Sequence, residues 1–141
     1  MTRQDLYTFI KTHRWAVEAT MASTGWPQTA VIGFIVTERL ELFFDTLKSS
    51  RKYQNLKNTS KISLVIGWDE GCTLQYEGHA DEPTGSDLLA LKSQYFEAFP
   101  DGYERALLAD IAYIRVAPVW LRYSDFCVSP PKIVELSEAG F

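Results

Sequence analysis

The stretch from Leu47 to Lys61 concentrates positive charge and could bind an anion. It holds five of the 14 lysines and arginines and no acidic residue. Ser49 or Ser50 is a natural N-cap for the short helix expected at Ser50–Lys57. Arg51 and Lys52 then fall in its first turn, where cations oppose the helix dipole. A bound phosphate would reverse this effect, because free N–H groups, a hydroxyl and two cations would converge on it. The pattern indicates either a phosphate site or a solvated basic surface.

Other motifs that carry chemistry are missing from the sequence. Neither GxxxxGK[ST] nor GxGxxG is present, so no nucleotide-binding loop supports the phosphate reading. Cys72 and Cys127 are 55 positions apart, and neither His13 nor His79 lies at a zinc-ligand spacing from them. We therefore expect no metal site, and the residues alone identify no catalytic acid, base or nucleophile.

The elements that must position these residues are mostly strands. We expect helices from Thr2 onward, at Ser50–Lys57 and at Thr84–Phe99, with Thr2 and Asp5 as a capping box for the first. Apolar or alternating runs predict strands at Ala16–Met21, Ala30–Val36, Leu40–Phe44, Lys61–Trp68, Thr73–Ala80, Ile111–Val116 and Val119–Phe126. Pro118 separates the last two runs and indicates a bend, a bulge or a strand boundary.

The order of these elements favours an antiparallel barrel. Strands and helices do not alternate regularly, so a parallel βαβ sheet is not expected. Ala30–Val36 is apolar on both faces. One face would fill the barrel and the other would need a helix or a second subunit to cover it, which suggests a dimer.

Composition sets further limits. The chain has 141 residues, 46% of them hydrophobic and 13% aromatic, which is typical of a single folded domain over residues 1–141. A net charge of −4 argues against a nucleic-acid-binding protein. No run of 18 apolar residues predicts a membrane span, and the N-terminus lacks the apolar segment of a signal peptide. We expect a cytoplasmic protein.

A longer pattern connects the basic stretch to its flanking strands. Residues 42–52, LFFDTLKSSRK, are followed by Asn55-Leu56 and by the strand KISLVIGW. Further on come Glu77-Gly78-His79-Ala80 and the closing YIRVAPVWLRYSDF. From about Pro27 onward, the sequence resembles the pyridoxamine-5′-phosphate-oxidase-like FMN-binding split barrels.

The resemblance implies a mainly β fold, a six-stranded antiparallel split barrel of Greek-key type with inserted helices. It also implies a homodimer with FMN at each subunit junction. Ser50, Arg51 and Lys52 would bind the FMN phosphate, and Asp45 and Thr46 would contact the flavin. The implied contacts with the remaining parts of the cofactor are Gln28 and Thr29 along the isoalloxazine ring, Thr73 near the phosphate or ribityl chain, and Trp120 from the partner subunit.

The sequence departs from the true oxidases where they bind the substrate phosphate. At the spacing of their Tyr-x₃-Arg pattern, Tyr95 is followed by Phe99, and their closing Arg-x-His pair is missing. Asp45 also stands where the oxidases carry an aromatic residue. The resemblance therefore implies an FMN-dependent oxidoreductase acting on another small molecule. The alternatives are a flavin- or haem-binding module without a substrate and a deazaflavin-dependent reductase.

Overall fold

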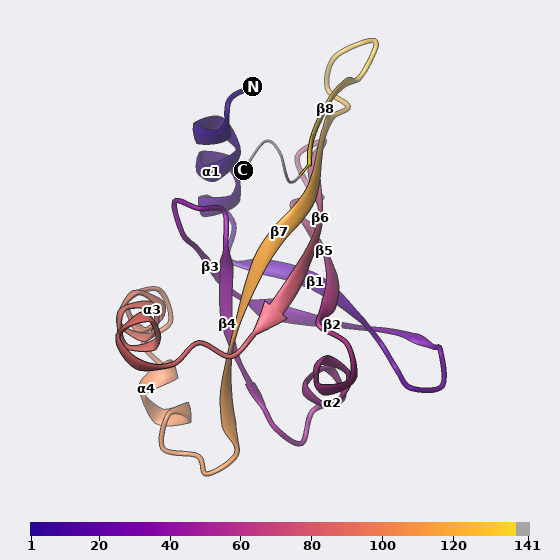
Figure 1. Ribbon diagram of the computed structural model, residues 1–141. Coiled ribbons are helices and arrows are strands. Elements are labelled where there is room, and N and C mark those ends of the chain that lie inside the picture. The colour runs from indigo at the N-terminus through magenta and orange to yellow at the C-terminus, as the bar shows by residue number, and fades with distance from the viewer. Residues whose placement is uncertain (138–141) are drawn as a thin grey trace.

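One antiparallel sheet curls into a split barrel in the computed structural model, which describes residues 1–137 (Figure 1). Its strands follow the order β2-β1-β5-β6-β7-β4-β3, and β8 pairs with β7. The strands are β1 (Trp15–Met21), β2 (Pro27–Gly33), β3 (Ile35–Val36), β4 (Leu42–Leu47), β5 (Lys61–Ile66), β6 (Cys72–Asp81), β7 (Ile111–Asp125) and β8 (Lys132–Ser137). The mainly β split barrel is confirmed, although the described residues form eight strands rather than six.

The difference in strand number has two sources. The run Ala30–Val36 is divided, because β2 ends at Gly33 and Phe34 separates it from the two-residue β3. The sequence pattern also gave no strand after Phe126, whereas β8 pairs with β7 from Asp125↔Lys132 to Trp120↔Ser137. This strand lies along an edge, where exposed residues give little hydrophobic signal.

Pro118 marks a change of partner within β7 rather than its end. Along one edge, β7 pairs first with β4, through residues 111–116, and then with β8, through residues 120–125. Its pairing with β6 continues past the proline but shifts register between Glu77 and Gly78. Proline has no N–H to donate, so it suits the gap between the two partners. Of the bend, bulge or strand boundary indicated at Pro118, the structure has an irregularity of the bulge type, and the division into two strands is wrong.

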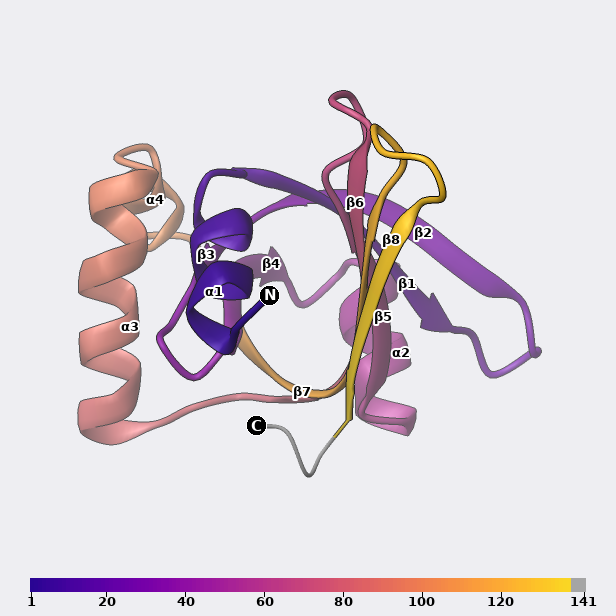
Figure 2. The same ribbon diagram turned by 90° about the horizontal axis from the view of Figure 1, so that it is seen from above.

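In the described part of the chain, four helices flank the sheet: α1 (Arg3–Lys11), α2 (Arg51–Asn58), α3 (Gly85–Ala98) and α4 (Gly102–Arg105). The capping box of Thr2 and Asp5 is present at the start of α1. Helix α4 was not expected from the sequence. Figures 1 and 2 show α3 and α4 beside β3 and β4, whereas α2 lies near the opposite part of the sheet. Helix α2 packs against β1 and is the element that carries the basic stretch.

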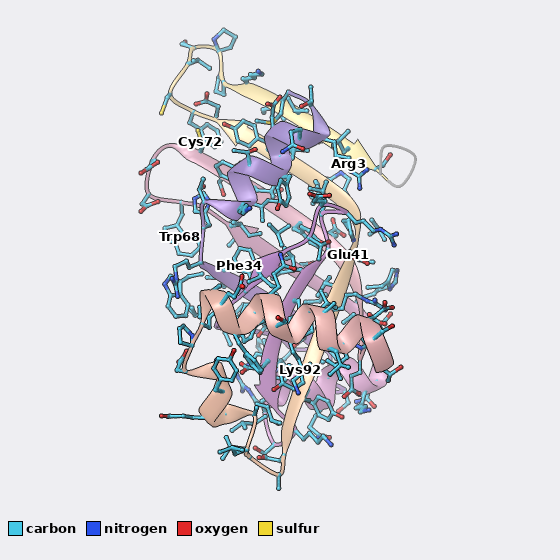
Figure 3. All side chains as sticks on the ribbon, turned by 90° about the vertical axis from the view of Figure 1, so that its left-hand side faces the viewer. Arg3, Phe34, Glu41, Trp68, Cys72 and Lys92 are labelled. Carbon is cyan, nitrogen blue, oxygen red and sulfur yellow. The ribbon has the colours of Figure 1, made fainter. Side chains whose placement is uncertain are left out.

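Aromatic side chains fill much of the barrel core. Phe43, Phe44, Tyr76 and Tyr95 are fully or almost fully buried. The Tyr76 hydroxyl donates to the carbonyl oxygens of Leu40 at 2.9 Å and Val116 at 3.1 Å, so its burial leaves no unmet polar group. Figure 3 shows α3 lying across the molecule next to α1. Since Phe43 and Phe44 belong to β4, the core holds this strand in place, and the last residues of β4 lead into α2.

The outer face of β1 and β2 stays partly apolar and accessible. Val31 is 63% exposed, and Val17 and Ala19 on the same face are half-buried. The β1–β2 hairpin extends away from the body of the barrel (Figures 1 and 2).

Among residues 1–137, no helix is long and apolar enough to cross a membrane.

Candidate functional site

The N-terminus of α2 is organised by two hydroxyl groups. The Ser50 side chain accepts a hydrogen bond from the Tyr53 N–H at 3.3 Å, as expected of an N-cap. The Thr46 and Ser50 hydroxyls also hydrogen-bond to each other at 3.0 Å. Thr46 lies on β4, so this bond fixes the first turn of α2 against the barrel. Arg51 and Lys52 occupy that first turn, which confirms the predicted helix and its cap.

These two cations lack carboxylate partners. Within residues 1–137, neither Arg51 nor Lys52 forms an ion pair, whereas the Lys57 amine at the other end of α2 lies 2.8 Å from a Glu82 carboxylate oxygen. No acidic residue lies in the first turn of α2. The positive charge at this helix end is therefore not neutralised by an ion pair, and an anion there would be stabilised by both the cations and the helix dipole.

A cavity of about 140 Å³ separates this helix end from the β1–β2 hairpin. Its lining residues are Glu18, Thr20, Gln28, Thr29, Ala30, Arg51 and Lys52. The register of the hairpin explains how they meet, because Glu18 pairs with Ala30 and Thr20 with Gln28. Side chains of such pairs share one face of the sheet, and that face is the one toward α2.

An amide on α2 ties the helix to this hairpin. The Asn55 side-chain nitrogen donates to Thr20 Oγ1 and to Gln28 Oε1, each at 3.0 Å. Asn55 and Thr20 are both buried, so these bonds are shielded from competing water. They set the spacing between the α2 N-terminus and the β2 segment that the resemblance places along the flavin.

Glu18 is a buried carboxyl group in the same cavity. Its exposed fraction is 1%, and no hydrogen-bond partner for its Oε2 atom is found in residues 1–137. Burial raises the pKa of Glu18 from its usual 4.5 to about 7, because the charged form is poorly solvated, while the positive charge of Lys52 lowers it. The cavity therefore combines two cations with a carboxyl group that can be neutral near physiological pH.

The donors around this cavity fit a phosphate group. The serine-capped helix end supplies N–H groups, and Arg51 and Lys52 supply positive charge and form no ion pair in the described part of the chain. Gln28 and Thr29 add polar groups suited to a larger ligand that extends from the phosphate. This site brings together Gln28, Thr29, Thr46, Ser50, Arg51 and Lys52 of the nine residues assigned to the cofactor.

Asp45 is occupied by other partners. Its carboxylate accepts from Arg105 Nε at 2.7 Å and from the Tyr95 hydroxyl at 3.2 Å. The pKa of Tyr95 is raised, first by burial and then by the charge of Asp45. The Asp45 side chain thus links β4 to α3 and α4, and both of its oxygen atoms already have partners.

Thr73 and Trp120 lie outside the cavity at the α2 N-terminus. Thr73 pairs with Ser124 near the far end of β6. Trp120 lines a separate cavity of about 320 Å³ on the outer face of the sheet, together with Thr29 and Val17. This subunit's own Trp120 therefore shares a surface with the segment assigned to the flavin, whereas Thr73 is not among the residues that line this second cavity.

Three site residues were not identified from the sequence: Glu18, Thr20 and Asn55. The available sequence signal for Glu18 was the alternation along β1, which places Glu18 on the same face of the strand as Ala16 and Thr20. The structure buries all three residues. An acidic residue at a buried position is rarely left without a partner, and this one could have been singled out. Within residues 1–137, no group of acidic, histidine or cysteine residues could hold a metal ion.

Solved structures of known proteins share this fold at low sequence identity. A heme binding protein from Mycobacterium smegmatis has a TM-score of 0.86 at 13% identity, over 98% of this chain and 58% of its own. HutZ, the heme storage protein from Vibrio cholerae, has a TM-score of 0.72 at 18% identity, over 84% of this chain and 91% of its own. General Stress Protein 26 from Bacillus anthracis has a TM-score of 0.72 at 19% identity, over 95% and 98%.

The chain spans less than three-fifths of the Mycobacterium smegmatis protein, and at these identities the matches show the fold alone. No curated protein matches by sequence. The sequence family described as pyridoxamine 5′-phosphate oxidase does match, over residues 3–125. Since this match covers most of the chain and the fold agrees with it, the protein belongs to the pyridoxamine 5′-phosphate oxidase family.

Proposed function

We propose that the protein binds FMN, with the phosphate at the N-terminus of α2. The observation that carries this proposal is that Arg51 and Lys52, which form no ion pair in residues 1–137, lie on a serine-capped helix end that opens onto a polar cavity. Ser50, Arg51 and Lys52 would bind the phosphate. Gln28 and Thr29, held at a set spacing through Asn55, would orient the rest of the cofactor.

Bound FMN would supply electron or hydride transfer, and this chain would supply binding, orientation and a shielded site. The partly apolar outer face of β1 and β2 supports a homodimer in which a second copy covers Val17, Val31 and the cavity beside Trp120. Each cofactor would then lie at a subunit junction. The proposed activity is that of an oxidoreductase acting on a small molecule.

The substrate is not expected to be pyridoxamine 5′-phosphate. A second phosphate would need its own cations, and the three arginines that follow α3 are engaged in ion pairs. Arg105 pairs with Asp45 at 2.7 Å, Arg115 with Asp81 at 2.6 Å, and Arg122 with Glu135 at 2.9 Å. Releasing any of them would break an existing contact.

The test of the FMN site compares FMN with riboflavin, which lacks the phosphate. We expect the wild type to bind FMN more tightly, and Arg51→Ala to weaken FMN binding by about tenfold or more, since a hydrogen bond to a charged group contributes about 1.5–3 kcal/mol. Riboflavin binding should change little. Lys57→Ala is the matched control, because Lys57 lies on the same helix but pairs with Glu82. Equal wild-type affinities for FMN and riboflavin would disprove the phosphate assignment.

Haem binding is the second candidate, favoured by the fold shared with haem-binding proteins of Mycobacterium smegmatis and Vibrio cholerae. A haem iron takes an axial ligand such as histidine. His13 lines a cavity of about 380 Å³ together with Lys11 and Arg14, whose charges could pair with propionates. The visible spectrum of the freshly purified protein separates these candidates: two flavin bands, a haem Soret band, or one near-violet band for a deazaflavin.

A further inference from the structure

The position of Glu18 poses an electrostatic problem for the proposed FMN site. Its carboxyl group lines the same cavity of about 140 Å³ as Arg51 and Lys52, where the phosphate would bind. An ionised carboxylate there would repel a phosphate, since the cavity is partly shielded from water. The charge of Lys52, which favours the ionised form of Glu18 in the free protein, would be largely neutralised by the phosphate.

We propose that Glu18 takes up one proton when FMN binds, so that the phosphate is held by Arg51 and Lys52 beside a neutral carboxylic acid. The proton comes from solvent and joins the Glu18 carboxylate, and no other bond changes. The neutral acid could then donate a hydrogen bond through its otherwise unpartnered oxygen. This inference rests on the proposed function and adds a pH dependence to it.

The surroundings of Glu18 support this assignment. On β1 and its neighbours, the residues beside Glu18 are neutral: Ala30 is opposite on β2 and Leu64 is opposite on β5. The other polar residues at the cavity, Thr20, Gln28 and Thr29, do not titrate. From α2, the charged groups that face the cavity are Arg51 and Lys52. Glu18 is therefore the acidic group at this cavity, and the described chain places no second carboxylate in its lining.

The pH range follows from the free protein. Burial places the pKa of Glu18 at about 7, so the carboxyl group is half ionised near neutral pH before FMN binds. Bound phosphate raises that pKa further, because it adds negative charge and offsets Lys52. Binding above neutral pH then requires a proton, and affinity falls as pH rises.

The test measures FMN affinity and proton uptake in the wild type and in Glu18→Gln between pH 6 and pH 8. The ratio of the wild-type Kd to the variant Kd should rise about tenfold over this range, since one proton with a pKa near 7 must be gained. Taking this ratio removes the ionisation of the FMN phosphate itself, which is the same for both proteins. Calorimetry at pH 8 in buffers of different ionisation enthalpy should show about one more proton taken up per FMN by the wild type than by the variant.

Two controls keep the result interpretable. Glu70→Gln changes an exposed carboxyl group in the loop before β6 and should behave as the wild type. Carboxyl ¹³C resonances of the wild type, recorded with and without FMN, report the ionisation of Glu18 directly and do not depend on whether the variant folds. A constant Kd ratio, or an ionised Glu18 in the FMN complex at pH 7.5, would overturn the inference while leaving FMN binding intact. Failure of the wild type to bind FMN would overturn the proposed function and this inference together.

Discussion

Because of Glu18, the free energy of unfolding of the ligand-free protein should decrease as the pH rises toward neutral. Its folded-state pKa of about 7 lies above the value of 4.5 expected for an exposed glutamate. Below pH 4.5, the group is protonated in both the folded and the unfolded chain, so it costs nothing. As pH rises toward 7, the unfolded chain releases the proton while the folded chain retains it, and the free energy of unfolding decreases.

The size of this effect can be worked out from the shift. A difference from 4.5 to about 7, at about 1.4 kcal/mol per pKa unit, corresponds to a total of about 3 kcal/mol. Most of this loss, about 2–3 kcal/mol, falls between pH 5 and pH 8. Glu18→Gln keeps the shape of the side chain but cannot ionise. Its stability relative to the wild type should therefore increase by about 2–3 kcal/mol over that interval.

The assay is urea unfolding of the ligand-free proteins, followed by tryptophan fluorescence at pH 5, 6.5 and 8 and at one protein concentration. Measuring both proteins at each pH cancels the contributions of all other titrating groups, and Glu70→Gln serves as the surface control. If the stability difference between wild type and Glu18→Gln stays constant within about 0.5 kcal/mol, the site is more hydrated than its burial implies, and the pKa argument fails.

Three further predictions concern the assembly, the substrate and the packing of α4. Light scattering after size exclusion should give the mass of a dimer for the wild type, and a monomer mass at micromolar concentration would contradict this. Val31→Asp should favour the monomer, because it places a charge on the apolar outer face of the β1–β2 hairpin. FMN-loaded protein should turn over pyridoxamine 5′-phosphate about two to four orders of magnitude less efficiently than a dedicated oxidase, measured as aldehyde formation, because two arginine–phosphate contacts are missing. Asp45→Asn should lower the free energy of unfolding, measured in urea, by about 1–3 kcal/mol, because it leaves the 31% exposed Arg105 side chain without its most buried partner. Asp101→Asn removes the exposed partner of Arg105 and should change the free energy of unfolding little.

The ion pair of Asp45 and Arg105 joins β4 to α4. At the position where the resemblance implies an aromatic residue in the oxidases, this chain carries Asp45, and its charge is balanced by Arg105 across β4 and α4. The same ion pair removes Arg105 from any role in binding a substrate phosphate. Asp45 on β4 thus accounts for the contact with α4 and engages the charge of Arg105.

Local sequence patterns were sufficient for the elements that carry the site. The cap at Ser50, the first turn at Arg51 and Lys52, and the alternating run of β6 depend on contacts within a few residues, and the structure contains all of them. The helix-dipole argument needs no tertiary information either. These features made a candidate anion site visible in the amino-acid sequence.

The contents of the cavity depended on strand register and packing. Glu18 lies far from α2 in the sequence and joins Arg51 and Lys52 only because β1 pairs with β2 and α2 packs against β1. The partnership of Asp45 with Arg105 likewise spans 60 positions. No local periodicity records such contacts, since they arise when separate elements bury a shared face. The sequence by itself therefore determined where an anion could bind, and the tertiary structure determined that a buried, titratable carboxyl group would lie beside it.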